Sequence, residues 1–411
     1  MNSDKFIINY NDLKIAITDI FTTIGMDKND AELVADVLVE AELRGIPSHG
    51  LVRVKDYLGL WQKNRLNINA KPKIIRESLA TALVDGDNGL GMISGDFAMN
   101  LAISKAQNAG CSVVVVNNSN HFGIAGYYAI KAVKHDMIGI AMTNANPTVA
   151  PTFAKQAMLG TNPIAFAMPT QNEPIFLADF ATVPIARGKV ELLEKQGKTV
   201  PEGMLQNADG MPTTDPSILR KKGMILPLGG DYEHAGYKGY CLTAIVDILT
   251  AVLSGANFGN FVPPQVSYLP EKDYYPGKGL GHFFAAIKLD AFRPANEVKE
   301  YMDLWIKTMR AATPIDPNQP VLIPNDPEGY YGKSLVLYSI DSISDARINI
   351  YKAIEKYNLG NTKIGKEVDE PAKYVTKAAS AISAVPYTHT DLQNGDQGRW
   401  QERYVLGPIV Y

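Results

Sequence analysis

The segment SHGLVR at residues 48–53 combines a hydroxyl, an imidazole and a guanidinium in one short stretch. If a helix begins here with Ser48 as its N-cap, His49 lies in the first turn and Arg53 follows four residues later on the same face. A nearby guanidinium disfavours the imidazolium, so His49 can move a proton near neutral pH. Arg53 can hold a carboxylate through two hydrogen bonds. A 2-oxo or 2-hydroxy acid substrate needs both functions, but a solvent-exposed capping turn explains the segment about as well.

A second polar segment, residues 118–126, contains His121 and two glycines. It follows the β-branched run at 113–116, which predicts a strand buried on both faces. The segment then lies at the carboxyl end of that strand, where ligands bind in α/β sheets, and its backbone N–H groups can face an anion. A plain polar turn between a strand and a helix is an equally good interpretation.

Three further groups of residues each predict, taken alone, an ordinary turn beside a core element. They are residues 160–165 with 179–182 and 186–189, residues 236–240, and residues 279–284. Lys238 lies near the start of an apolar helix predicted at 240–253, where its positive charge favours a phosphate or carboxylate.

Gly89, Gly91 and Gly95 imitate a dinucleotide-binding fingerprint, because they follow a predicted strand and precede a predicted helix. Their spacing is GxGxxxG, one residue too long, and the next strand ends in Asn117 and Asn118 rather than in an acidic residue. We therefore favour a glycine turn over a Rossmann site. The sequence has no metal-ligand spacing such as HExxH and no GxSxG elbow, so we expect neither a metal site nor a hydrolase triad.

The composition is that of an ordinary globular protein. The chain has 411 residues, 46% of them hydrophobic, and a net charge of −3, which argues against nucleic acid as a partner. Cys111 and Cys241 cannot form a disulfide framework, and their apolar neighbours predict small buried thiols. There is no apolar run long enough to cross a bilayer and no secretory leader, so we expect a cytoplasmic protein without a membrane partner.

Hydrophobic periodicity predicts the elements that position these segments. Residues 10–65 are expected to be helical, with helix starts near Asn11 or Asp12, at Asp27 or Asn29, and at Ser48. Residues 185–232 are expected to form a long polar loop, and the apolar helix at 240–253 is expected to be central. Strands are predicted at 81–84, 113–116, 137–143, 164–169, 175–179 and 283–289, and helices at 97–109 and 126–134.

Eight motifs in order, between about residues 5 and 328, resemble the malate/L-lactate dehydrogenase family. This family is distinct from the Rossmann-type lactate and malate dehydrogenases, and it includes ureidoglycolate dehydrogenase, diketogulonate reductase and sulfolactate dehydrogenase. Each motif alone is weak, but their shared order is specific. The motifs are SHGLVR, NSNHFGIAGYYA, GTNPIAFAMP, LADFAT, ARGKVELLEKQGKTVPEGML, NADGMPTTDP, GYKGY and GHFFAAI.

The resemblance implies an α/β fold: a non-Rossmann nicotinamide-binding mixed sheet with a helical substrate-side domain, as in the L-sulfolactate dehydrogenase-like fold. It implies that residues 76–289 bind the cofactor and that residues 1–75, with 290–328, form the helical part. It also implies a homodimer. Residues 329–411 match nothing in the family, and within them we expect a strand at 335–339 and a helix at 344–357.

The resemblance further implies a role for each matching residue. The activity is hydride transfer between a small malate- or lactate-like 2-hydroxy acid and NAD or NADP, with NAD slightly favoured. His49 is the proton donor and acceptor, Ser48 its relay partner, and Arg53 binds the substrate carboxylate. His121 and Thr161 contact the substrate. The cofactor residues are His121, Phe122, Gly123, Ile124, Ala125, Asp179, Phe180, Ala181, Lys238, Gly281, His282 and Phe283, with no metal ligand.

One departure bears on the substrate: Val183 stands where many members have serine, which removes a hydrogen-bond donor. Two alternatives remain open, namely reduction of a cyclic imino acid carboxylate and an inactive cofactor-binding protein. The presence of both His49 and Arg53 argues against the second.

Overall fold

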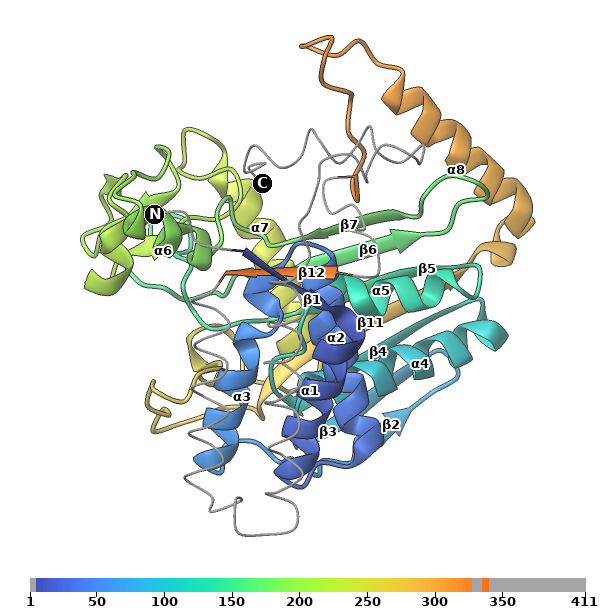
Figure 1. Cartoon of the computed structure of the whole chain (residues 1–411), viewed down its shortest axis with the longest axis horizontal. Coiled ribbons are helices and arrows are strands. Elements are labelled where there is room, and N and C mark those ends of the chain that lie inside the picture. Colours follow the sequence, from blue (N-terminus) through green and yellow to red (C-terminus); the bar gives the residue numbers. More distant parts are fainter. Residues whose placement is uncertain (1–4, 327–334, 340–411) are drawn as a thin grey trace.

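A seven-stranded mixed sheet forms the centre of the computed structural model, which describes residues 5–326 and 335–339 (Figure 1). Its strand order is β2-β3-β4-β11-β5-β6-β7. Within it β3 and β4 are parallel and the other neighbours antiparallel, so the non-Rossmann mixed sheet is confirmed. The strands are β2 (Lys73–Glu77), β3 (Thr81–Gly89), β4 (Cys111–Ser119), β5 (Met137–Thr143), β6 (Ile164–Met168), β7 (Phe176–Phe180) and β11 (Leu280–Lys288).

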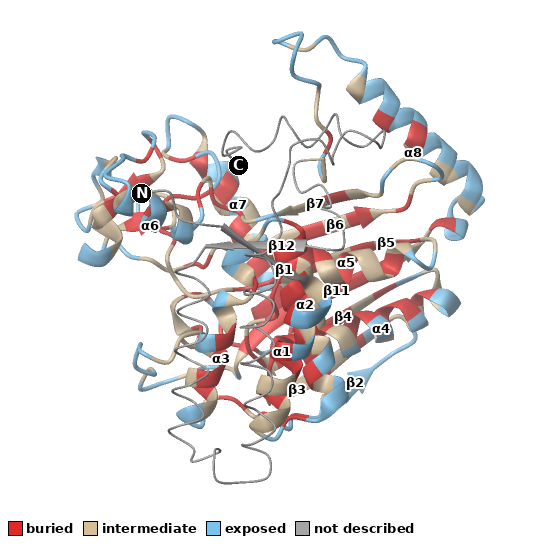
Figure 2. Cartoon of the chain, viewed as in Figure 1, coloured by how far each residue is buried: buried red, intermediate tan, exposed pale blue. Residues whose placement is uncertain are grey.

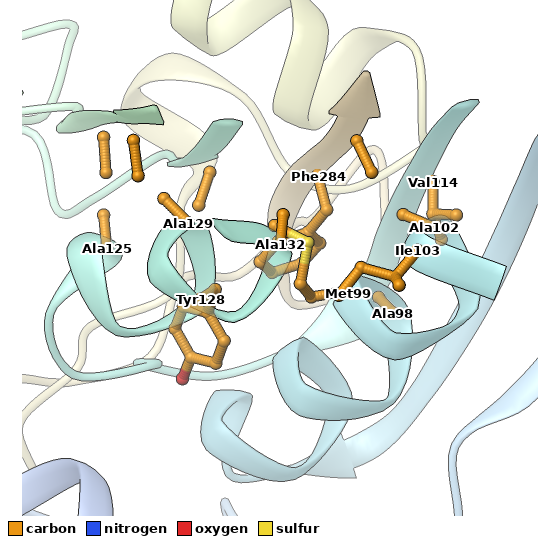
Figure 3. Packing of buried hydrophobic residues seen from close by; sticks show 14 of the residues in the cluster. Ala98, Met99, Ala102, Ile103, Val114, Ala125, Tyr128, Ala129, Ala132 and Phe284 are labelled. Atoms are coloured by element: carbon orange, nitrogen blue, oxygen red, sulfur yellow. The ribbon is translucent and has the colours of Figure 1, made fainter. Parts of the chain in front are cut away.

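Helices α4 (Gly91–Ala109) and α5 (Ala125–Val133) cover one face of this sheet. Small and apolar side chains pack them closely against β4 and β11 (Figure 3). The fully buried rings of Tyr128 and Phe284 meet edge to face at 5.4 Å. The helix predicted at 97–109 was placed six residues too late, because α4 begins at Gly91.

Gly91 shows why the glycine segment is not a phosphate loop. A Cβ added there would lie 2.2 Å from the backbone oxygen of Asn120, so the glycine lets α4 begin directly against the loop after β4. The favoured interpretation, a glycine turn before a helix, agrees with this packing.

Three N-terminal helices form a second core beside the start of α4. They are α1 (Tyr10–Thr23), α2 (Lys28–Leu43) and α3 (Val52–Gln62). The Asp27 side chain accepts from the Asn29 N–H and caps α2, as predicted. The predicted start of the third helix at Ser48 is wrong, because Pro47–His49 form a separate 3-10 turn, η1.

The opposite face of the sheet carries α7 (Gly236–Asp247), which continues into the π-helix η3 (Ile248–Val252). Leu249 packs on Val115 and Phe283, but Ile248 and Val252 are 53% and 60% exposed. The prediction of a central helix is therefore wrong. An apolar run by itself cannot tell a buried helix from one with an exposed apolar face.

Residues 185–232 form an ordered unit rather than the predicted long loop. It holds α6 (Arg187–Lys195), the 3-10 helix η2 (Pro216–Lys221) and a three-stranded sheet of order β10-β8-β9. These strands are only two residues long, below what periodicity can detect. They are β8 (Leu205–Gln206), β9 (Pro212–Thr213) and β10 (Met224–Ile225), around the buried Val190, Val200 and Leu205.

Towards the C-terminus, α8 (Ala295–Arg310) crosses the turn of the β6–β7 hairpin with one side exposed (Figure 2). The carboxylate of Asp303 accepts from the backbone N–H groups of Gln171, Asn172 and Glu173. Two short 3-10 turns, η4 (Gly259–Phe261) and η5 (Leu289–Ala291), complete this part.

Strand β12 (Leu335–Ser339) pairs antiparallel with β1 (Lys5–Asn9), which confirms the predicted strand beyond residue 329. The helix predicted at 344–357 lies outside the described residues. The domain boundaries given above stay a prediction.

The prediction of buried thiols is wrong for both cysteines. Cys111 and Cys241 are free and exposed. Cys111 opens β4 at the rim of the sheet, and Cys241 lies on the exposed side of α7, so apolar neighbours in sequence did not imply burial. None of the helices in the described ranges is long and apolar enough to cross a membrane.

Candidate active site

Strands β3, β4, β5 and β7 point in the same direction. β3 is parallel to β4, β11 is antiparallel to both β4 and β5, and β6 is antiparallel to both β5 and β7. Their carboxyl ends therefore meet at one edge of the sheet. We call this the carboxyl edge; it carries the segments that follow Gly89, Ser119, Thr143 and Phe180.

Residues 48–53 hold their three functional groups together through a 3-10 turn rather than along one helix face. The Ser48 Oγ lies 2.9 Å from the His49 Nδ1, and the Arg53 Nε donates to the Ser48 carbonyl oxygen at 2.6 Å. Arg53 Nη1 also donates to Asp56 at 3.0 Å. Ser48 is therefore no helix cap; it links the imidazole to the guanidinium.

The turn is fixed by a buried carboxylate of α2. The backbone N–H of Leu51 donates to the Glu42 Oε1 at 2.7 Å. A Cβ at Gly50 would lie 2.1 Å from that same oxygen, so only glycine lets the chain pass so close. Glu42 thus fixes the position of residues 48–53 relative to α2.

His121, after β4, lies against His49, with stacked rings whose centroids are 5.4 Å apart. Its Nδ1 accepts from the Gly123 N–H at 3.2 Å and lies 2.7 Å from the Tyr57 hydroxyl. Because Nδ1 accepts, the proton of the neutral ring is on Nε2, which is then a donor. The sequence interpretation missed Tyr57; its only signal was its position one turn after Arg53 on the same helix.

Both imidazoles are held neutral. Burial, and then the charge of Arg53, lower the pKa of His49 to about 4. Burial is also the main reason why the pKa of His121 lies well below its ordinary value; protonation of the adjacent His49 and the charge of Arg53 would each lower it further. At neutral pH the site therefore presents two uncharged rings beside one guanidinium.

Asp179, at the end of β7, joins that strand to α5. Its Oδ2 accepts from the Gly126 N–H at 2.7 Å, in the first turn of α5. Burial raises the pKa of Asp179 to about 6, although the Gly126 hydrogen bond and the charge of Arg44 oppose this. The N–H of Gly126, which we expected to face an anionic ligand, is therefore occupied by Asp179. The next residue, Phe180, is 39% exposed.

Thr161 and Lys238 lie on segments that meet the same edge. Thr182 donates to the Thr161 carbonyl oxygen through its N–H at 2.9 Å and its hydroxyl at 3.1 Å. Ala181 is half-buried between Asp179 and Thr182. Lys238 is exposed in the first turn of α7.

His282 and its neighbours lie inside the molecule. The His282 Nδ1 lies 2.7 Å from the Thr143 hydroxyl and its Nε2 2.8 Å from the Ser119 hydroxyl. Phe122 stacks on this ring at 4.8 Å, and burial lowers the pKa of His282 to about 3. Gly123, Ile124, Ala125, Gly281 and Phe283 are buried as well. These buried residues pack beneath the segments at the carboxyl edge. Direct cofactor contact by their side chains stays a prediction.

Comparison with known proteins shows the family of this chain. The family model described as malate/L-lactate dehydrogenase matches residues 8–332. The chain belongs to this family. It is thus a 2-hydroxy acid dehydrogenase, and dehydrogenases of the family use a nicotinamide cofactor.

Two relatives of the family show how close the match is. Malate dehydrogenase of Pyrococcus horikoshii is 43% identical over 297 residues, covering 72% of this chain and 80% of the relative. L-sulfolactate dehydrogenase of Methanocaldococcus jannaschii is 42% identical over 318 residues, covering 77% and 87%.

Solved structures of the family share the fold. Malate dehydrogenase from Entamoeba histolytica superposes with a TM-score of 0.77 at 33% identity, covering 86% of this chain and 99% of that one. Delta1-piperideine-2-carboxylate reductase from Pseudomonas syringae superposes with a TM-score of 0.67 at 26% identity, covering 78% and 91%. Among the described residues there is no group of three or more His, Cys, Asp or Glu side chains that could hold a metal ion.

Proposed function

We propose that the protein interconverts a small malate- or lactate-like 2-hydroxy acid and its 2-oxo acid with NAD(P), and that Ser48, His49, Arg53 and His121 carry the chemistry. The observation that supports this most is the contact between the two neutral imidazoles beside Arg53. The malate, sulfolactate and hydroxycarboxylate dehydrogenases among the relatives point the same way.

Arg53 binds the substrate carboxylate. Its Nε and Nη1 are held by the Ser48 carbonyl oxygen and by Asp56, so the plane of the guanidinium is fixed before substrate arrives. Its Nη2 has no partner in the part of the chain that the structure describes. A carboxylate that approaches this side gains a charge-assisted hydrogen bond without reordering the arginine.

His49 transfers the proton to or from the substrate oxygen through its Nε2, because the Ser48 hydroxyl faces its Nδ1. A carboxylate on Arg53 cancels the positive charge that helps to keep this imidazole neutral. Substrate binding therefore raises the proton affinity of His49. His121 offers its Nε2–H as a second donor to the substrate oxygen or carboxylate.

The residues at the carboxyl edge fit a nicotinamide cofactor. The exposed ring of Phe180, the backbone of Asp179 and Ala181, and the His121 donor offer an apolar surface beside polar groups, as a planar carboxamide-bearing ring requires. A reduced nicotinamide bound there supplies the hydride. On the resemblance NAD is slightly favoured over NADP.

The identity of the acid depends on the segment after β7. Val183 is 5% exposed and packs in the core of the small three-stranded unit, so it offers no donor to a substrate. The neighbouring Thr182 hydroxyl is engaged with the carbonyl oxygens of Thr161 and Asn162. We therefore propose that Arg53, His49 and His121 supply the polar contacts to a compact acid.

A second candidate is the reduction of a cyclic imino acid carboxylate, which the likeness to the Pseudomonas syringae reductase favours. It would use the same arginine and protonate a nitrogen instead of an oxygen. Parallel assays with pyruvate, oxaloacetate and a cyclic imino acid separate the two. A third possibility is cofactor binding without turnover, which a nicotinamide binding signal with no activity across this panel would support.

Replacing His49 tests the proposal. We expect H49N to lower kcat by about 100-fold or more, because positioned acid–base catalysis contributes about 10²–10⁴-fold, while NADH affinity stays within about twofold. The matched control is H135N, an exposed histidine after α5. Equal activity of H49N and wild type would refute the role of His49.

We further propose that the protein is a homodimer that docks through α7 and η3. Tyr237, Cys241, Ile245, Ile248 and Val252 recur at intervals of three or four residues along one exposed stripe, the α7 stripe. An exposed apolar stripe of this kind is characteristic of interfaces. We also propose a cytoplasmic location, where the two free thiols stay reduced.

A further inference from the structure

A cavity of about 510 Å³ lies beside the small three-stranded unit. Its walls come from the segment after β5, from the first residue of α6 and from the turn before β10. Its polar lining includes Thr148, Lys155, Arg187, Lys222 and Asn260. We call it the cationic pocket.

The charged side chains that line this pocket are all positive. Lys155, Arg187 and Lys222 line it, and no Asp or Glu is among its lining residues. The Arg187 Nε pairs with Glu191 at 2.8 Å, which leaves both Nη groups without a partner among the described residues. Neither lysine ammonium has an ion pair in those same ranges. Three cations facing one cavity repel one another, and an anion in the cavity relieves that repulsion.

Two further groups lack partners at this place. The Thr148 Oγ1 is buried and has no hydrogen-bond partner among the described residues. Such a hydroxyl costs about 1–3 kcal/mol unless a ligand or water satisfies it. At the start of α6 the N-cap residue Ala186 makes no side-chain hydrogen bond, and the Lys189 N–H already donates to the Ala186 carbonyl oxygen at 3.0 Å. Among the described residues the N–H groups of Arg187 and Gly188 therefore stay open to an anion.

The pocket shares the carboxyl edge with the proposed active site. His121 follows β4, Pro147 to Met158 follow β5, and Arg187 follows β7, and these three strands end at that edge. Asp179 already ties the end of β7 to the segment after His121 through Gly126. A ligand lying along this edge can therefore reach from His121 towards the pocket.

We infer that the cationic pocket binds a phosphate group. A phosphate offers the charge and the several acceptor oxygens that match the two lysines, Arg187 and the Thr148 hydroxyl. This group has two possible sources. It can be the 2′-phosphate of NADP, in which case the inference rests on the proposed function, or it can be a separate phosphate.

The test compares wild type with the double variant K155Q/K222Q, which removes two charges and keeps a polar, unbranched side chain one atom shorter at each position. The control is K221Q, the adjacent lysine, which does not line the pocket and lies 3.7 Å from Asp215. For each protein the Kd of NADPH and of NADH is measured by fluorescence, and the Tm is measured in inorganic phosphate and in chloride of equal ionic strength.

If the 2′-phosphate occupies the pocket, the double variant weakens NADPH binding by about tenfold or more and changes NADH binding by less than twofold. If a separate phosphate occupies it, phosphate raises the Tm of wild type and K221Q more than that of the double variant, and the ratio of the two cofactor affinities stays constant. The inference is overturned if the double variant matches wild type in both measurements.

Failure of the proposed function gives a different result. In that case neither cofactor binds to wild type, while the phosphate-dependent Tm shift and its loss in the double variant still report on the pocket. A variant that does not fold is recognised by its circular dichroism, and the single variants K155Q and K222Q then replace it in both measurements.

Discussion

His49 and His121 illustrate how two residues of one type receive different roles from their partners. The Ser48 hydroxyl faces the Nδ1 of His49, whereas the Tyr57 hydroxyl and the Gly123 N–H face the Nδ1 of His121. Arg53 lowers the pKa of both rings, but it is the largest cause after burial only for His49. A carboxylate on that arginine therefore acts first on His49, which couples substrate binding to proton transfer.

The first prediction concerns this coupling. In R53M the pKa of His49 rises above about 4 but stays below its ordinary value of 6.5, because burial, the larger cause of the shift, remains. The measurement is an NMR titration of the histidine rings. The control is K55M, on the exposed side of the same helix, which leaves the titration of His49 where it is in wild type. An unchanged midpoint in R53M would contradict the electrostatic argument.

Much of the site was predictable at this scale, because Ser48, His49 and Arg53 lie together in sequence and His121 follows a buried strand. Tyr57 was not, since a tyrosine in an amphipathic helix usually packs in the core, and its hydroxyl finds His121 only through the fold. The partner of Asp179 was also hidden, because Gly126 lies 53 residues away in sequence.

At the scale of elements, the positions of most central strands were predicted, but β3, β4 and β11 extend two to five residues beyond at least one of the predicted bounds, and β2 was not predicted. β5 has the predicted bounds, and the β6–β7 pair differs from them by a residue or so. Helix starts were less predictable. Gly91 and Gly95 are poor helix formers, so their presence hid the start of α4. Glycine stands at both positions because the loop after β4 and the ring of Tyr128 leave no space for a side chain.

The second prediction follows from this packing. We expect G91A to destabilise the protein by about 2 kcal/mol, because overpacking against a backbone that cannot move costs about 1–3 kcal/mol. The matched control is G188A in α6, where an added Cβ meets nothing within 4 Å. That substitution should stabilise slightly, since alanine favours a helix. Urea unfolding of both variants measures the difference, and equal stabilities would show that α4 can shift.

At the scale of the whole molecule, the α7 stripe leads to a third prediction. I248D places a charge in the proposed interface, so the mass by light scattering should fall from two chains to one. Ile15 on α1 is 55% exposed, close to the 53% of Ile248, and I15D should keep the dimer. A wild-type protein that is monomeric, or an I248D variant that stays dimeric, would exclude this interface.

A fourth prediction concerns residues 329–411. Every residue assigned to the site lies between Ser48 and Phe283, so a chain ending at Glu328 should keep kcat and KM within about twofold. The measurement is steady-state kinetics on the truncated and full chains, with oligomer mass alongside. A folded, truncated protein that loses more than about tenfold in kcat/KM would mean that the extension takes part in catalysis.

The pairing of β1 with β12 also has a consequence for synthesis. Residues 5–9 are made before the central sheet, but their partner strand, residues 335–339, is made only after the entire central sheet. β1 therefore has no ladder partner while the ribosome adds the intervening chain. A short unpaired edge must be kept from pairing wrongly during that time, so the last step in ordering the first strand comes after the dehydrogenase core has been synthesised.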